Sequence, residues 1–245
     1  MSLEFLEPDG ATSELGFEPV PASVLLPQAR EAGGRIELRD GWRVAAEYGS
    51  VERELEACRT AVGVGDVSCL GKLELQGPAS EVAAVGAAAG AEEIEFGRAA
   101  GGPEVWWCPF SARRLLAVCE PGRAPTLREA LADAATGRPV SVTDLTCALA
   151  GLALVGPRGR DVLARLTAID LRPPTTPEAS FRAGSVARIP AMVLREHGDR
   201  YVLMFGSAYA QYMWAQVTDA AEPLGGMTAG ADALARSREE VAAGA

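Results

Sequence analysis

Hydrophobic positions alternate with polar ones along several short segments and recur every three to four residues along others, which predicts a mixture of strands and helices. Residues 33–49 have the pattern of a strand, an Asp-Gly turn and a second strand. Residues 50–62 have the pattern of a helix, with Ser50 as its N-cap and Leu55 and Cys58 on one face. The chain is therefore expected to combine hairpins with amphipathic helices.

The segment 71–77 alternates as a half-buried strand does. Leu73 and Leu75 occupy one face, and polar residues occupy the other. This alternation predicts that Lys72, the only lysine of the chain, lies on a solvated face. The strand ends at Gly77-Pro78, where Gly tolerates an unusual backbone angle and Pro suits the first turn of a helix.

The same order of elements occurs twice, about 80 residues apart by the spacing of the pattern. In the second half, we expect a strand ending at Gly156-Pro157, a helix, a Pro-rich loop over 170–185, a strand pair over 186–206 around a turn, and a helix capped by Ser207. That last helix is expected to bury Tyr209, Met213 and Trp214 along one stripe.

This repetition predicts an α+β fold made of two strand–helix–hairpin–helix halves, with antiparallel-rich sheets that are each covered by helices on one side. We expect an extended N-terminal arm over residues 1–30, a first half over 31–140 and a second half over 141–245.

Each half contains one closely similar phrase, "DVSCLGKLELQGP" from Asp66 and "DLTCALAGLALVGP" from Asp144. An Asp two residues before a hydroxyl residue is typical of a turn in which the carboxylate accepts a backbone N–H bond, so we expect both aspartates to cap turns, supported by Ser68 and Thr146. The cysteine of each phrase has no neighbouring His or Lys motif that would lower its pKa, which favours packing over nucleophilic catalysis.

Composition narrows the classes of function. The net charge of -10 argues against nucleic-acid binding, which relies on clustered basic residues. No apolar run reaches the roughly 18–20 residues of a membrane span, and the acidic start "MSLEFLEPDG" lacks the features of a signal peptide. We therefore expect a cytoplasmic protein without membrane or nucleic-acid partners.

The five cysteines are widely spaced and contain no C-x-x-C pair, so neither a disulfide framework nor a zinc site is indicated, and we expect buried free thiols. The one histidine, His197, lies in the polar turn "REHGDR" and is expected to be a surface residue. No metal site is predicted, and most histidine-dependent chemistry is excluded.

The segment "GWRVAAEYGSVERELEACRTAVGVGDVSCLGKLELQGPAS" resembles the opening of the glycine-cleavage T-protein (aminomethyltransferase) folate-binding superfamily. The second half, through "LVGPRGRDVLARL", "AGSVAR" and "SAYAQYMW", is more specifically similar to the gamma subunits of heterotetrameric sarcosine oxidases. The likeness covers residues 35–236. It implies the T-protein fold and a place in one-carbon metabolism. The chain ends soon after the last family motif, where aminomethyltransferases continue into a C-terminal β domain.

The resemblance also implies which positions should carry acids. Val105 and Trp106 stand where aminomethyltransferases have an acidic pair near the folate nitrogen, and Glu104 is the neighbouring candidate for a substitute carboxylate. Val202 or Leu203 stands at the place of the family's pterin-anchoring Glu.

Ala231 takes the place of the arginine in the family's "GARD" segment. Arg236, Arg238 and Tyr201 are the candidate residues for a folate pocket. Because a buried pterin needs acidic partners for its N–H groups, these departures weaken the catalytic interpretation.

Three hypotheses follow from the resemblance. The first is a non-catalytic T-protein-fold subunit that acts with flavoprotein oxidase subunits or by self-association, and binds no cofactor itself. The second is a tetrahydrofolate-dependent aminomethyltransferase or demethylase with rearranged anchors. The third is a folate or small-ligand binding protein without catalysis. We favour the first, in which this chain alone catalyses nothing.

Overall fold

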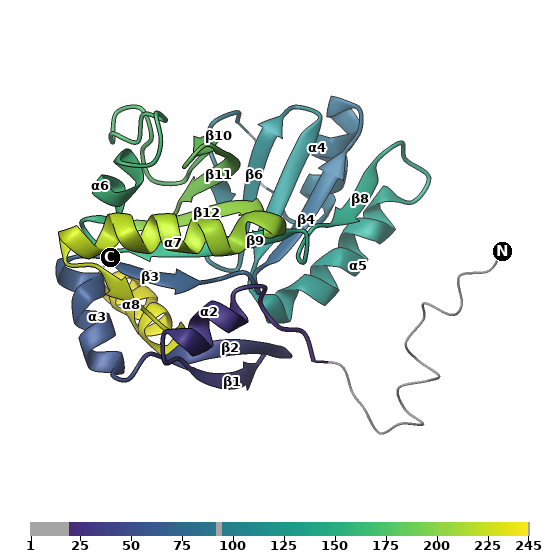
Figure 1. Cartoon of the computed structure of the whole chain (residues 1–245). Helices are drawn as coiled ribbons and strands as arrows, with labels where there is room; N and C mark the ends of the chain where they lie inside the picture. Colours follow the sequence, from purple (N-terminus) through teal and green to yellow (C-terminus); the bar gives the residue numbers. More distant parts are fainter. Residues whose placement is uncertain (1–19, 92–94, 245) are drawn as a thin grey trace, which may run out of the picture.

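Two sheets packed face to face form the centre of the protein, which a computed structural model describes over residues 20–91 and 95–244 (Figure 1). The six-stranded sheet has the order β10 (Ser180–Val186), β11 (Ile189–Arg195), β12 (Arg200–Gly206), β9 (Leu149–Val155), β3 (Gly63–Asp66) and β13 (Met227–Thr228). The five-stranded sheet has the order β5 (Ala100–Gly101), β6 (Val105–Ser111), β7 (Arg114–Cys119), β4 (Gly71–Gln76) and β8 (Ser141–Asp144). Every pairing except β3 with β13 is antiparallel.

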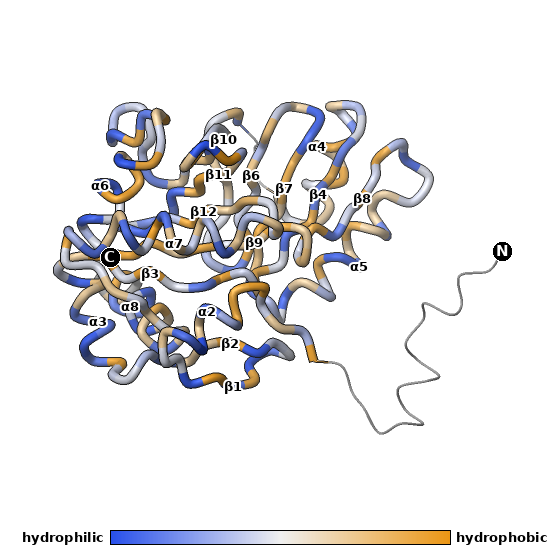
Figure 2. Tube along the Cα trace, in the orientation of Figure 1, coloured by the Kyte–Doolittle hydropathy of each residue, from blue (hydrophilic) through white to orange (hydrophobic). Residues whose placement is uncertain are grey.

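Helices cover the outer face of each sheet. The five-stranded sheet is covered by α4 (Ala79–Ala88) and α5 (Ala124–Ala135), and the six-stranded sheet by α6 (Gly159–Ala164) and α7 (Ala210–Ala221). Three hydrophobic clusters result, one under each helix pair and one between the sheets. Hydrophobic positions accordingly follow the central strands, and hydrophilic ones lie on outer helices such as α3 and in the outer loops (Figure 2). This arrangement confirms the predicted α+β fold with antiparallel-rich sheets.

Further elements gather below the sheets in Figure 1: α2 (Leu26–Glu31), the hairpin of β1 (Arg35–Arg39) and β2 (Trp42–Glu47), α3 (Val51–Thr60) and α8 (Ala231–Gly244). The described residues also form three short 3-10 helices, η2 (Pro121–Arg123), η3 (Ser207–Tyr209) and η4 (Glu222–Leu224). In the described parts of the chain, no helix is both long and apolar enough to cross a membrane.

The predicted local signals of the first half are confirmed. Asp40 and Gly41 both have positive φ, 48° and 79°, as the two-residue turn between β1 and β2 requires. Ser50 caps α3 by accepting a hydrogen bond from the backbone N–H of Arg53 at 3.3 Å.

The two sheets exchange strands at the repeated phrases. β3 precedes the first phrase yet pairs with β9, and β8 precedes the second yet pairs with β4. The backbone N–H of Val67 donates to the carbonyl of Gly151 at 2.9 Å, and that of Leu145 donates to the carbonyl of Lys72 at 2.7 Å. The chain therefore crosses from one sheet to the other at each phrase. The division of the chain at residue 140 stays a prediction.

The prediction for Lys72 is wrong. Its side chain is fully buried, and Nζ donates to the carbonyls of Ser68 at 2.9 Å and Leu70 at 2.8 Å. The alternation along β4 predicts one buried face and one solvent-exposed face, but both faces of this sheet are covered. Even Glu74, on the same face as Lys72, is buried.

Four expectations of local structure also need correction. The end of the predicted loop, residues 180–185, belongs to β10, and the apolar run after it is broken by a turn at Ala187-Arg188, where both residues have positive φ. Ser207 starts η3 and makes no capping bond. Tyr209 is 47% exposed, although Met213 and Trp214 are buried as expected.

The fourth correction concerns the predicted N-terminal arm. Residues 26–30 of that arm form helix α2 together with Glu31, preceded by the fully buried Leu25, while residues 1–19 lie outside the described residues. The helix is only 6 residues long, too short for its periodicity to stand out in the sequence.

Candidate functional site

A cavity of about 500 Å³ opens at the end of the two sheets nearest α3 and α8. Its walls come from α3, the start of β6, the end of β9, the turn between β11 and β12, and α8. Its size falls within the ~300–1,000 Å³ range of small-molecule sites. The lining residues are Cys58, Arg59, Pro103, Trp106, Val155, Gly156, Pro157, Glu196, His197, Gly198, Asp199, Arg200, Ser237, Arg238, Glu240 and Val241.

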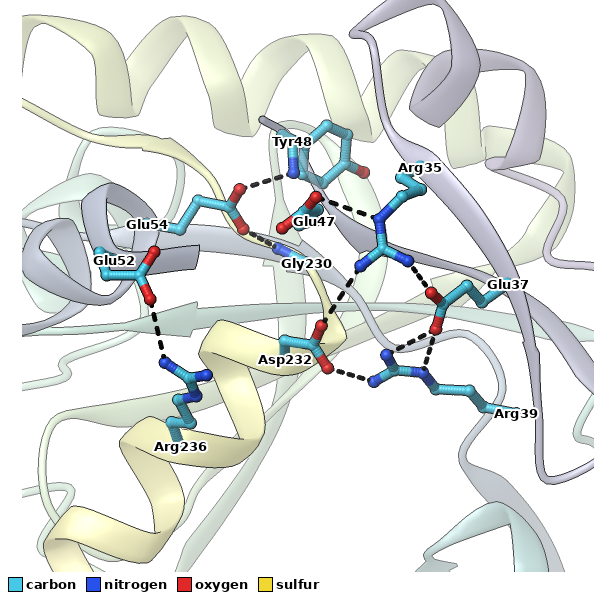
Figure 3. Close-up of polar contacts among 10 residues, drawn as sticks. All are labelled: Arg35, Glu37, Arg39, Glu47, Tyr48, Glu52, Glu54, Gly230, Asp232 and Arg236. Atoms are coloured by element: carbon cyan, nitrogen blue, oxygen red, sulfur yellow. Dashed lines mark hydrogen bonds and ion pairs between the residues drawn. The ribbon is translucent and has the colours of Figure 1, made fainter. Parts of the chain in front are cut away.

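Helix α8 is held against this site by a buried carboxylate. Glu54 accepts hydrogen bonds from the backbone N–H groups of Tyr48 at 2.6 Å and Gly230 at 2.8 Å (Figure 3). Gly230 has no room for a Cβ, which would lie 2.2 Å from the carbonyl oxygen of Ala46. Glu54 therefore fixes both the end of β2 and the start of α8.

A partly buried chain of charges forms one wall of the cavity. Arg200 donates through Nε to Glu196, and both side chains are almost fully buried. Arg238 lies 3.9 Å from the same Glu196 carboxylate and pairs with Glu120 on its other side. Burial lowers the pKa of Arg200 from its ordinary value, and the charge of Glu196 opposes that shift. These carboxylates are thus engaged by guanidinium groups.

Trp106 forms an aromatic wall with His197. Their ring centroids lie 5.2 Å apart, and Trp106 is 2% exposed, with no hydrogen-bond partner for its indole N–H in the described residues. His197 is exposed, as predicted, and its Nδ1 lies 3.4 Å from Glu178. Trp106 thus brings a large apolar surface to the position where the family resemblance implies an acid.

The other positions of the implied acids are apolar too. Val105 packs on the opposite face of its sheet, toward α4 and α5. Val202 is fully buried between the two sheets, and Leu203 is fully buried under α6 and α7. No carboxylate stands at any of these four positions.

Two of the candidate residues lie away from the cavity lining. Glu104 is exposed beside Pro103, and its backbone carbonyl accepts from the N–H of Glu120 at 3.4 Å. Tyr201 is buried in the cluster under α6 and α7, with the Arg195 guanidinium 5.8 Å from the centre of its ring.

The two candidate arginines of α8 point in different directions. Arg238 lines the cavity, whereas Arg236 reaches back to Glu52 on α3, 3.4 Å away (Figure 3). The aspartate of the altered "GARD" segment, Asp232, binds Arg39 at 2.5 Å and lies 3.8 Å from Arg35, which fastens α8 to β1.

A second cavity of about 210 Å³ adjoins the first, since Arg200 and Arg238 line both. Asp66 and Cys69 of the first repeated phrase also line this smaller cavity. Burial raises the pKa of the Asp66 carboxyl, and its hydrogen bonds with Ser23 and Ser68 oppose that rise.

The thiol in the larger cavity is poorly suited to catalysis. Burial raises the pKa of Cys58 to about 11, so its thiolate is scarce near neutral pH. Within residues 20–91 and 95–244, no three His, Cys, Asp or Glu side chains are grouped so that they could hold a metal ion.

Sequence reasoning missed the pair of Glu196 and Arg200. The two residues flank the turn "EHGDR", which looked like a polar surface turn, and only the packing of α8 over that turn buries them. The signal in the sequence that could have indicated this ion pair is the spacing of Glu196 and Arg200, two opposite charges four residues apart on either side of the turn between two strands.

Residues 105–244 match the family model of the GCVT N-terminal domain. The aminomethyltransferase of Streptomyces avermitilis is 28% identical over 211 residues, which cover 80% of this chain and 56% of that protein. The aminomethyltransferase of Moorella thermoacetica is 26% identical over 232 residues, covering 86% of this chain and 61% of that protein. The chain thus spans little more than half the length of these relatives.

Two solved structures share the fold. The glycine cleavage system aminomethyltransferase T of Bartonella henselae superposes with a TM-score of 0.71 at 18% identity, over 88% of this chain and 61% of that one. A chain of the heterotetrameric sarcosine oxidase of Corynebacterium sp. U-96 superposes with a TM-score of 0.62 at 23% identity, over 70% of this chain and 91% of that one.

Proposed function

This chain belongs to the family of the GCVT N-terminal domain, within the T-protein-like folate-binding superfamily, and from this premise we propose that it is a non-catalytic module that acts with a partner protein. The partner class is a flavoprotein oxidase, as the likeness to a sarcosine oxidase chain suggests, and the cytoplasm is the compartment we assign to the assembly.

The observation that carries this proposal is the apolar floor of the large cavity. Trp106 lines this cavity and Val202 is buried between the two sheets, at two of the places where the family resemblance implies carboxylates. A pterin ring presents amino and amide N–H groups, and burying these groups against the Trp106 indole would leave them without acceptors at that position, at a cost of about 1–3 kcal/mol each. The nearby Glu196 is already engaged by Arg200.

Native co-purification tests the proposal. We expect the tagged chain, isolated from cells that express it at its natural level, to elute with a flavoprotein in a fixed ratio and to carry flavin absorbance. Leu38→Ala, a change at an exposed residue of the β1–β2 hairpin away from the cavity, serves to show that recovery does not depend on one surface residue. A chain that elutes alone in its natural host contradicts the proposal.

A second candidate function, binding of tetrahydrofolate with or without one-carbon transfer, is favoured by the size of the cavity, about 500 Å³. Calorimetric titration of the purified chain with tetrahydrofolate tests it. Sub-millimolar binding that is weakened by Arg238→Gln, and left unchanged by the matched Arg236→Gln outside the cavity, would establish a folate site and overturn the purely structural role.

A further inference from the structure

The cysteines of the two repeated phrases meet at one cavity. A hollow of about 300 Å³ is lined by both Cys69 and Cys147, together with Asp144, Thr146 and Arg128. Cys147 is exposed, and Cys69 is half-buried. This hollow is separate from the large cavity near α8, with which it shares no lining residue.

Lys72 shows how close the two turns lie. Its Nζ donates to the carbonyls of Ser68 and Leu70, the residues on either side of Cys69. The same Nζ lies 3.5 Å from the carbonyl oxygen of Thr146, which directly precedes Cys147. One amine therefore touches the backbone next to both cysteines.

We propose that Cys69 and Cys147 form a reversible intramolecular disulfide across this hollow, with a hydroperoxide as the oxidant. This modification site is independent of the proposed function. Cys147 is exposed at the same hollow that Cys69 lines, and formation of the bond requires the two sulfurs to approach each other there, because Cα atoms joined by a disulfide lie within about 4.4–6.8 Å of each other.

The reaction has two balanced steps. The Cys147 thiolate attacks one oxygen of hydrogen peroxide, and the O–O bond breaks to give a sulfenic acid. The departing hydroxide combines with the proton that the thiol released and leaves as water. The Cys69 sulfur then attacks the Cys147 sulfur while its proton passes to the departing hydroxide, the S–O bond breaks, and the second water leaves. Two thiols lose two electrons, and one peroxide is reduced to two waters.

The surroundings of each thiol assign these roles. Burial, with the nearby Asp66 charge, raises the pKa of Cys69 to about 12, so Cys69 does not initiate the reaction but resolves an intermediate held beside it. Burial also raises the pKa of Cys119 to about 11 and that of Cys108 well above its ordinary value. Of the five cysteines, only Cys147 is exposed to an oxidant.

Peptide mapping of the full-length protein after mild peroxide treatment and thiol alkylation tests the proposal. We expect an intact mass lower by two hydrogens, a linked pair of peptides containing Cys69 and Cys147, and full reversal by dithiothreitol. Cys69→Ser and Cys147→Ser should each abolish the link, and the matched Cys58→Ser should keep it.

The wild-type map decides the outcome even if a variant fails to fold. A link that uses another cysteine, a dimer joined through Cys147, or oxidation of Cys147 to sulfinic acid without a link each overturns the proposal.

Discussion

The turns at Asp66 and Asp144 repeat one another bond for bond but differ in their surroundings. Asp66 accepts a hydrogen bond from the N–H of Ser68 at 2.9 Å, and Asp144 accepts one from the N–H of Thr146 at 2.9 Å. Both aspartates therefore cap their turns, as their sequence spacing predicts. The repeated phrase encodes a local structure that needs no ligand.

The hydroxyl groups extend the repetition across the two sheets. Ser68 Oγ accepts from the N–H of Gly151 at 3.0 Å, and Thr146 Oγ1 accepts from the N–H of Lys72 at 3.1 Å. Gly151 and Lys72 hold equivalent places in the two phrases, so each turn is fastened to the strand of the other half. The phrases are joints where the sheets exchange strands.

The two joints differ in burial, and the residue that distinguishes them in the sequence is Lys72. The side chain of Lys72 fills the first joint and binds its carbonyls, whereas its counterpart Gly151 has no side chain. The first joint lies beside α8 and the second at the surface. This difference shows that the same sequence segment can form either a buried, charged crossing between the two sheets or an exposed one.

Lys72→Met should show the largest effect on this comparison. The change keeps the length of the side chain but leaves two buried carbonyls of the first joint, and the more distant carbonyl of Thr146, without this donor, so we expect a loss of about 2–4 kcal/mol in the free energy of unfolding. Chemical denaturation measures it. Arg128→Met, which removes an exposed partner of Asp144 at the second joint, is the control and should cost less than about 0.5 kcal/mol. Equal costs would remove the distinction.

The effect of Lys72→Met should also grow with pH. Burial lowers the pKa of Lys72 from 10.5 to about 8, so between these values the unfolded chain binds more protons than the folded one, and stability rises with pH. The variant lacks this group, and the difference between wild type and variant should widen by about 1–3 kcal/mol over that window. A difference that narrows as the pH rises would show that the charged form is the one favoured by the fold.

The stability losses caused by replacing the two aspartates should differ by a smaller amount. Asp66→Ala removes an acceptor in a largely buried turn and should cost about 1–2 kcal/mol, while Asp144→Ala at the exposed turn should cost about 0.5 kcal/mol. Thermal unfolding of both variants under one set of conditions measures the ratio. If Asp144→Ala proved the more destabilising of the two, burial would not govern the strength of these caps.

Part of this fold could be predicted from the sequence alone. The Asp40-Gly41 turn, the Ser50 cap and the two Asp turns depend on neighbouring residues, and the sequence identified each of them. The likeness to the T-protein fold came from the order of such local elements. These features are local, so no knowledge of packing was needed.

The errors concern what distant segments do to one another. Lys72 was expected in solvent because nothing in its own strand reveals that a second sheet covers it. The pair of Glu196 and Arg200 was missed because α8, about forty residues later, buries a turn that is polar in sequence. The exchange of strands at the two phrases likewise depends on pairing between the halves.

Amide hydrogen exchange at Gly151 and Lys72 tests most directly whether the repeated phrases are strand-exchanging joints. We predict that Ser68→Ala speeds exchange of the Gly151 N–H by about fivefold, in line with the loss of roughly 1 kcal/mol, and leaves the Lys72 N–H unchanged. Thr146→Val should do the reverse. Equal acceleration at both amides, or none at either, would contradict the account.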